Sequence, residues 1–259
     1  MTTRGTDQRG SAFAGRVAIV TGGTRGIGAA ITERLMEGGA HVVAVYASND
    51  QAAAELVGRL SSGPGSVSLH RADVGDPDAC RALVSEVLGA QGRVDHLVNN
   101  AGLLVENSPR RMTQADWDLS IRVNLSGPFY LAQAVLDPMI GNGFGRIVNI
   151  GSVTAVMGSA VEAGYGAAKA GLLGLSRSLA RAVAHRGITV NVVVPGVFET
   201  EMTWAMAPEA QDAIRSMIPV RRRGDPSELA HAVAFLLDDR AGYITGSVLT
   251  VDGGLSMGG

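Results

Sequence analysis

The sequence lacks the residues and runs that mark several classes of protein. It has one cysteine, Cys80, so neither a disulfide nor a cluster of thiolate ligands can form within one chain. No apolar run approaches the roughly 20 residues that a spanning helix needs, and residues 1–14 contain no apolar signal-peptide core. We therefore expect a soluble, cytoplasmic protein with no membrane partner and with a flexible N-terminal tail over residues 1–14.

An excess of positive charge is also absent. The 22 lysines and arginines are balanced by 24 acidic residues, and no basic stripe carries interleaved aromatic residues, so we expect no nucleic-acid partner. The five histidines show no metal-site spacing, such as two on adjacent turns of one helix. We predict no metal site and assign no catalytic role to these histidines, which are His41, His70, His96, His185 and His231.

The sequence instead alternates short β-branched runs with longer segments of helical spacing. The short runs are largely apolar, as strands are when both faces of a parallel sheet are covered. They are Val17–Val20, His41–Tyr46, Val67–Leu69, His96–Val98, Arg146–Ile150, Thr189–Val194 and Ser247–Val251. The helical segments are Ile27–Glu37, Gln51–Leu60, Pro77–Leu88, Thr113–Ile140, Tyr165–His185 and Pro226–Leu237. This order predicts an α/β fold with a Rossmann-type doubly wound parallel sheet of about seven strands, in a single domain over residues 15–259.

One long irregular region interrupts this alternation, from about Pro195 to Pro226. A loop of that length in a compact domain is usually functional, often as a cover over an active site. We predict a lid at about residues 196–225, apolar and partly helical; the alternative is that its apolar side chains only pack the segment onto the body. Those side chains are Phe198, Met202, Trp204, Met206 and Met217.

The first predicted strand runs directly into a glycine-rich segment, Thr21 to Gly28. Glycines permit a tight turn there and bring backbone amides close to a pyrophosphate at a helix N-terminus. Because the segment lies between a strand and a helix at the start of a β-α-β unit, it predicts a dinucleotide site. The residues predicted to bind the cofactor there are Gly22, Thr24, Arg25, Gly26, Ile27 and Gly28.

The end of the second strand indicates which dinucleotide is bound. Dinucleotide sites usually place an acidic residue there for the ribose 2′-hydroxyl, whereas this chain has Tyr46, Ala47 and Ser48. These three residues are predicted cofactor contacts, and Arg25 can reach toward a 2′-phosphate, so we predict NADP(H). The alternative is that Arg25 only lies on the surface and that Asp50 replaces the missing acid.

Four polar residues are candidates for proton chemistry. Tyr165 and Lys169 are spaced i, i+4 at the start of a helix, so both project from one face. A lysine ammonium there, together with the positive charge of a bound nicotinamide, can supply much of what is needed to lower a phenol pKa of about 10 toward 7. Ser152 follows a strand and lies at the carboxyl edge of the sheet, where it can donate to a substrate carbonyl. The amide of Asn124 could hold a water that passes protons to Lys169.

These motifs, in this order and spacing, resemble the short-chain dehydrogenase/reductase family over Gly15 to Gly254. The further motifs are Asp73-Val74, Asn99-Asn100-Ala101-Gly102 and Pro195-Gly196. The resemblance implies that Asp73 and Val74 contact the adenine and that Asn100, Ala101 and Gly102 line the cofactor. It implies that Lys169 holds the nicotinamide ribose beside Tyr165 and that Pro195, Gly196, Val197 and Thr200 border the nicotinamide. It also implies a homotetramer.

Within the family, the segments Pro195–Thr203, Tyr243–Gly246 and Val251–Gly254 are similar to 3-oxoacyl-(acyl-carrier-protein) reductases. This implies an NADPH-dependent reductase of a 3-ketoacyl thioester, either a small molecule or bound to a carrier protein. Asp137 and the neutral Gly141-Asn142-Gly143 stand where that group often has basic residues, although Arg186 is retained, so carrier-protein docking is doubtful. The alternatives are a reductase or dehydrogenase of free ketones, sugars or other secondary alcohols, and a non-catalytic nucleotide-sensing protein.

One charge run has two interpretations. Arg221-Arg222-Arg223, just after the predicted lid, could meet a phosphate of the cofactor, of phosphopantetheine or of coenzyme A. A solvated charge run is the more common meaning of such a triplet.

Overall fold

The centre of the protein is one sheet of seven parallel strands. The computed structural model describes residues 12–60, 63–200 and 208–257. In it the strands are ordered β3-β2-β1-β4-β5-β6-β7. They are β1 (Val17–Thr21), β2 (His41–Tyr46), β3 (Ser66–Arg71), β4 (His96–Asn99), β5 (Gly145–Ile150), β6 (Ile188–Pro195) and β7 (Val248–Val251). The predicted doubly wound parallel α/β fold is confirmed, with each strand within two residues of its predicted ends on either side.

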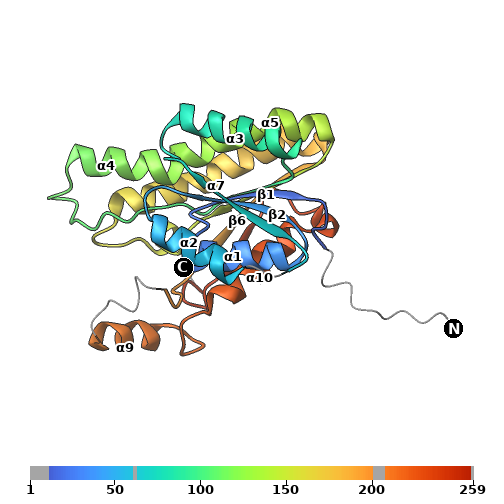
Figure 1. Ribbon diagram of the computed structural model, residues 1–259. Coiled ribbons are helices and arrows are strands. Elements are labelled where there is room, and N and C mark those ends of the chain that lie inside the picture. The colour runs from blue at the N-terminus through green and yellow to red at the C-terminus, as the bar shows by residue number, and fades with distance from the viewer. Residues whose placement is uncertain (1–11, 61–62, 201–207, 258–259) are drawn as a thin grey trace.

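Helices cover both faces of the sheet (Figure 1). α1, α2 and α10 lie on one face, and α3, α4, α5 and α7 lie on the other. The helices are α1 (Gly26–Glu37), α2 (Asp50–Arg59), α3 (Pro77–Gln91), α4 (Gln114–Ile121), η2 (Arg122–Ser126), α5 (Gly127–Asn142), α6 (Thr154–Met157), α7 (Ala163–Val183), η3 (Ala184–Arg186), α9 (Pro208–Met217), α10 (Pro226–Leu237) and η4 (Asp239–Ala241). Within the described residues, none of them is long and apolar enough to cross a membrane.

The inner strands are buried on both faces, which explains their unbroken β-branched sequences. Every residue of β1, β4, β5 and β6 is buried, whereas the edge strands β3 and β7 are partly exposed. One apolar cluster packs α1 and α10 onto the sheet, and a second packs α3, α5 and α7 onto the opposite face. Burial of this apolar surface is the main stabilising contribution to the fold.

The strand order reverses between β1 and β4. The chain leaves β1 for α1 on one face of the sheet, and it leaves β4 for α4 and α5 on the other (Figure 1). In open parallel sheets, the crevice beyond the carboxyl ends of such strands is where ligands bind. The topology therefore places a candidate site beside Thr21 and Asn99, the last residues of β1 and β4.

The structure differs from the sequence prediction in three places. The segment predicted as one helix, Thr113–Ile140, is α4, a π-helical turn (η2) and α5. The short helix α6 and the helix α9 were not predicted as separate elements. Phe13, placed in the predicted tail, is buried, and its backbone N–H donates to the carbonyl of Gly38 over 2.8 Å. The folded body therefore begins before residue 15.

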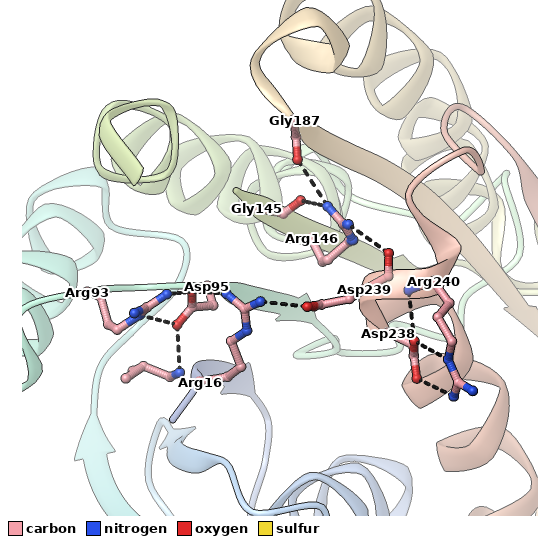
Figure 2. A network of polar contacts seen from close by, with 10 residues as sticks. Arg16, Arg93, Asp95, Gly145, Arg146, Gly187, Asp238, Asp239 and Arg240 are labelled. Atoms are coloured by element: carbon pink, nitrogen blue, oxygen red, sulfur yellow. Dashed lines mark hydrogen bonds and ion pairs between the residues drawn. The ribbon is translucent and has the colours of Figure 1, made fainter. Parts of the chain in front are cut away.

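The amino-terminal edge of the sheet holds a network of charged residues (Figure 2). The buried Asp95 carboxylate accepts from Arg16 Nη1 over 3.2 Å, from Arg93 Nε over 2.8 Å and from the backbone N–H of Val17 over 2.9 Å. Arg16 also pairs with Asp239 over 2.8 Å. Because this network lies at the edge opposite the switch-point crevice, we assign it a structural role, joining β1 and β4 to η4.

His96 is enclosed beside this network. Its side chain is fully buried, and neither ring nitrogen has a hydrogen-bond partner among the described residues. Its ring packs edge-on against Phe13 and Phe144 at centroid distances of 5.5 and 6.0 Å. Burial lowers the pKa of His96 from 6.5 to about 4.

This burial predicts acid sensitivity. Below pH 6.5 the unfolded chain binds a proton at His96 that the folded chain does not bind, so stability falls as the pH falls from 6.5 toward 4. When the pH is lowered from 7 to 5, the unfolding free energy of both proteins falls. The fall should be about 2 kcal/mol smaller in His96→Leu than in the unsubstituted protein. Urea unfolding at both pH values measures this. His231→Leu, at an exposed position, is the control and should keep the full pH dependence. An equal loss in His96→Leu would contradict the assignment.

Candidate active site

The glycine-rich segment forms a tight turn between β1 and α1. Gly22 and Gly26 have φ of +60° and +51°, a region that other residues rarely adopt. A Cβ at Gly28 would lie 1.9 Å from the carbonyl oxygen of Gly22. Arg25 occupies the N-cap position of α1 with an exposed side chain. The turn therefore presents the first amides of α1 at the switch point, which is the cradle a pyrophosphate requires.

Thr21 and Asn100 hold this turn against the loop after β4. Asn100 Nδ2 donates to the carbonyl oxygens of Thr21 over 2.9 Å and Gly22 over 3.2 Å. Thr21 Oγ1 accepts from the backbone N–H groups of Asn100 over 3.0 Å and Ala101 over 2.9 Å. The predicted cofactor residue Asn100 thus shapes the cradle through its side chain. Thr21, to which the sequence analysis gave no role, is the other half of this clamp.

The loop after β6 forms a second wall. A Cβ at Gly26 would lie 3.6 Å from Thr200 Cγ2, so the predicted nicotinamide-bordering segment reaches the glycine turn. A Cβ at Gly196 would lie 2.7 Å from the Cα of Asp252, which explains why position 196 is glycine. Two backbone walls without side chains at their closest points are suited to a flat, extended nucleotide. The residues present therefore fit a dinucleotide.

The ends of β2 and β3 would face the adenosine end of such a ligand. Ala47 and Ser48 are exposed, and no acidic residue stands at this strand end. Asp50, the alternative acid, is the first residue of α2; it hydrogen bonds to Tyr46, whose pKa is raised chiefly by that bond. Arg71 Nε donates to the carbonyl of Ala47 over 3.0 Å, and Arg71 Nη1 lies 3.8 Å from the Asp50 carboxylate. Asp50 is thus engaged within the chain, and Arg71 places a cation beside the site.

The predicted adenine contacts follow β3. Asp73 accepts from the backbone N–H of Gly75 over 2.8 Å and from Arg122 Nη1 over 2.8 Å. The bond from Arg122 is the main reason that the pKa of Asp73 is lowered. Val74 is buried, and its carbonyl lies 2.7 Å from where a Cβ on Gly127 would be. Arg122 therefore anchors the Asp73 turn from η2.

Three of the predicted catalytic residues converge at the carboxyl edge of the sheet. Ser152 follows β5, and Tyr165 and Lys169 lie on the first turns of α7. Ser152 hydrogen bonds to the Tyr165 hydroxyl, and Lys169 Nζ lies 5.6 Å from the centroid of the Tyr165 ring. Lys169 Nζ also donates to the carbonyl of Ile150 over 2.8 Å. A hydroxyl pair and an ammonium thus share one buried corner of the crevice.

Burial dominates the electrostatics of this corner in the protein alone. Burial raises the pKa of Tyr165, and a hydrogen bond with Ser152 opposes that shift only in part. The Lys169 side chain is 3% exposed, and burial lowers its pKa to about 8. The expected lowering of the phenol pKa toward 7 needs the positive charge of a bound nicotinamide beside Lys169, and it stays a prediction. In the protein alone, burial raises the pKa of the phenol above its usual value.

Asn124 lies in η2, where one wide turn interrupts the α4–α5 segment. Its Nδ2 donates to the carbonyls of Leu103 and Ser120, each over 3.0 Å, and its Oδ1 accepts from the backbone N–H of Leu103 over 3.2 Å. A Cβ at Gly102 would lie 2.8 Å from Asn124 Oδ1 and 3.6 Å from Lys169 Nζ. Both side chains therefore face the same point. Both N–H groups of the Asn124 amide donate to backbone carbonyls, and its oxygen has one lone pair left that can accept a hydrogen bond from a water.

A buried polar chain fixes the distance between β4, β5 and α7. Asn99 Nδ2 donates to Asn149 Oδ1 over 2.7 Å, and Asn149 Nδ2 donates to Ser176 Oγ over 2.8 Å. Because these amides lie away from water, the bonds hold α7 and its tyrosine in one register against the sheet. Asn149 and Ser176 gave no signal in the sequence beyond being polar residues within apolar elements.

The arginine triplet divides into separate roles. Arg222 pairs with Glu228 through two bonds of 2.6 and 2.7 Å, and Glu228 belongs to the capping box of α10. Arg223 is buried, with its Nε 3.2 Å from Glu199 and its Nη2 2.8 Å from Gln211. Arg221 has φ of +60° and donates to the carbonyl of Ser216 over 2.6 Å. All three guanidinium groups therefore bond to other parts of the chain, and the solvated-run interpretation fails for Arg223, which is buried.

The predicted lid is described in part. Phe198 is buried, and the backbone N–H of Glu199 donates to the carbonyl of Gly224 over 2.9 Å, which closes the base of the segment. α9 lies to one side of the sheet (Figure 1), and Met217 at its end is exposed. Met202, Trp204 and Met206 lie outside the described residues.

Comparisons with known proteins identify a family and several relatives of the chain. A family profile described as enoyl-(acyl carrier protein) reductase matches residues 22–256. The 3-oxoacyl-(acyl-carrier-protein) reductase FabG of Escherichia coli (strain K12) is 44% identical over 247 residues, which is 95% of this chain and 99% of that protein. The FabG of Vibrio cholerae is 44% identical over 94% of this chain and 98% of its own length. Acetoacetyl-CoA reductase of Allochromatium vinosum is 42% identical over 93% of this chain and 99% of its own length.

The chain belongs to the short-chain dehydrogenase/reductase family. It is an oxidoreductase that acts on CH–OH and C=O groups, and its family uses a nicotinamide cofactor.

Proposed function

We propose that this enzyme reduces the 3-keto group of an acyl thioester to a secondary alcohol with NADPH. The observation that carries the proposal is the meeting of Ser152, Tyr165 and Lys169 beside the glycine turn. The names of the relatives, a 3-oxoacyl-(acyl-carrier-protein) reductase and an acetoacetyl-CoA reductase, support the thioester.

The side chains have distinct tasks in this reaction. When bound, the nicotinamide supplies the hydride that adds to the carbonyl carbon. Ser152 donates a hydrogen bond to the carbonyl oxygen, and the Tyr165 hydroxyl gives that oxygen its proton as the alkoxide forms. The raised pKa of Tyr165 keeps the phenol protonated, which is the form that reduction needs. Lys169, with a pKa of about 8, can stabilise the phenolate and return its proton through a water at Asn124 Oδ1.

The preference for NADPH rests on charge at the ends of β2 and β3. No carboxylate stands at Tyr46, Ala47 or Ser48 to repel a 2′-phosphate, and Asp50, beyond them, lies 3.8 Å from Arg71 Nη1. Arg25 on the glycine turn has an exposed guanidinium that can pair with the phosphate.

The same catalytic side chains also suit other substrates. Free ketones, sugars or other secondary alcohols would need the same side chains and no thioester. The intact catalytic group argues against the alternative of an idle nucleotide sensor. Asp137 lies on α5, and the neutral Gly141-Asn142-Gly143 follows it, so we favour a small coenzyme A thioester over an acidic carrier protein. Carrier-protein binding and the homotetramer stay predictions.

A substrate screen tests the proposal. We expect NADPH oxidation with acetoacetyl coenzyme A at a kcat/KM at least about tenfold above that for free ketones or for NADH in place of NADPH. Crotonyl coenzyme A, which offers a C=C bond and no keto group, is the control substrate for enoyl reduction, and it should be unreactive. Faster turnover of a free ketone would favour the second candidate, and faster turnover of crotonyl coenzyme A would overturn the ketone assignment.

A further inference from the structure

Glu162 holds a carboxylate next to the catalytic group. It occupies the N-cap position of α7, three residues before Tyr165. The backbone of Glu162 is not helical there (φ −125°, ψ 35°), so the position of its carboxylate follows from its contacts and not from helical spacing. Its backbone forms a parallel bridge with Asn107 of the loop after β4, where the N–H of Asn107 donates to the carbonyl of Val161 over 2.8 Å.

The carboxylate is fixed by the segment that carries the catalytic serine. Thr154 Oγ1 donates to Glu162 Oε2 over 3.0 Å, and the backbone N–H of Thr154 donates to Ser152 Oγ over 3.2 Å. One residue therefore holds both the hydroxyl that meets the substrate oxygen and the carboxylate beside it. Among the described residues, no lysine, arginine or histidine forms an ion pair with Glu162, which is half-buried.

We propose that Glu162 is a specificity-determining residue that disfavours substrates with a negative charge close to the reacting carbonyl. The inference rests on the proposed function. A free 3-oxo acid carries a carboxylate two carbons from the ketone, whereas the corresponding thioester is neutral there. A fixed, unpaired carboxylate beside Ser152 and Tyr165 repels the acid and leaves the thioester unaffected. The site thus selects activated acyl groups over their hydrolysed forms.

The same charge acts on Tyr165. Its pKa is raised mainly by burial, and the negative charge of Glu162 raises it further, against the hydrogen bond with Ser152. Among the described residues, Lys169 also faces this ring, with its Nζ 5.6 Å from the ring centroid. A neighbouring carboxylate that favours the neutral phenol is consistent with a site built to donate a proton.

The first test compares a charged substrate with a neutral one that is larger by one methyl group. Glu162→Gln keeps the shape and can still accept from Thr154, but it removes the charge. We expect kcat/KM for acetoacetate, relative to that for methyl acetoacetate, to rise about tenfold in this variant. Glu55→Gln, on the exposed side of α2, is the matched control and should leave the ratio unchanged. An unchanged ratio in Glu162→Gln would overturn the proposal.

The second test needs no substrate. Ultraviolet titration of Tyr165, obtained by subtracting the Tyr165→Phe variant, should shift to lower pH in Glu162→Gln. The chain has four tyrosines, so the subtraction leaves a signal large enough to resolve. An unchanged titration refutes the placement of the charge. Failure of the unsubstituted enzyme to reduce acetoacetyl coenzyme A refutes the proposed function instead, and the tyrosine titration still decides on Glu162.

Discussion

Replacing Tyr165 with phenylalanine is expected to lower kcat for ketone reduction by about 10²–10⁴-fold. The substitution removes the hydroxyl that would protonate the alkoxide and leaves the ring, which packs beside Lys169 Nζ. NADPH affinity and unfolding free energy should change little, because the glycine turn and the Asn100 clamp are untouched. Steady-state kinetics, NADPH fluorescence titration and urea unfolding measure the three quantities.

Tyr243→Phe is the control for this substitution. Tyr243 is fully exposed and lies in the turn before β7, so the same loss of a hydroxyl should leave turnover unchanged. Full activity in Tyr165→Phe would remove the tyrosine from the mechanism. A loss of activity with an equal loss of stability would mean that its role is structural.

Replacing Lys169 with methionine should reduce kcat/KM by about 10²-fold or more, and it should abolish one limb of the pH profile. Burial holds the pKa of Lys169 at about 8, so in the unsubstituted enzyme kcat/KM should fall as the pH rises through 8 and the ammonium loses its proton. In Lys169→Met that limb should be absent. Unfolding free energy should change by no more than about 2 kcal/mol. Removing the buried charge stabilises the folded protein, and this offsets the cost of leaving the carbonyl of Ile150 without its hydrogen bond from Lys169.

Lys169→Arg separates charge from proton transfer. Arginine keeps its proton at every accessible pH, so this variant should retain more activity than Lys169→Met and should also lack the limb near pH 8. If both variants kept the unsubstituted profile, the titrating group would be another residue.

The elements that the sequence predicts well are those set by local pattern. The β-branched runs gave all seven strands because inner strands of a parallel sheet are buried on both faces. The glycine turn and the pair Tyr165 and Lys169 were readable because each is contiguous or spaced by one helical turn. The resemblance to a family then joined motifs that lie far apart in the chain.

The features that the local sequence pattern did not predict depend on contacts between segments far apart in the chain. The π-helical turn at Asn124 adds one residue to a helix, and the spacing of apolar residues did not predict this insertion. Its amide is paired with Leu103, about 20 residues away, and the threonine of the Thr21 clamp meets a loop 79 residues later. Arg223 looked like part of a solvated run because its partners, Glu199 and Gln211, lie on other segments.

Electrostatics were the least predictable feature. The i, i+4 spacing indicated that Lys169 and a bound nicotinamide lower the phenol pKa, but it gave no sign that burial raises the pKa of Tyr165 in the protein alone. The sequence analysis assigned no role to Glu162, and its significance comes from Thr154, which holds the carboxylate beside Ser152. Burial sets the pKa of Tyr165, and a fixed neighbour gives Glu162 its role. The spacing of residues along the chain predicts neither.

Isotope transfer tests the central claim most directly. The purified enzyme is incubated with acetoacetyl coenzyme A and NADPH deuterated at the transferable position of the nicotinamide, and the product is analysed by mass spectrometry and NMR. The account predicts 3-hydroxybutyryl coenzyme A with one deuterium on C3, and about 10²–10⁴-fold slower formation by Tyr165→Phe. A product without deuterium on C3, or no reduction of the keto group at all, would contradict it.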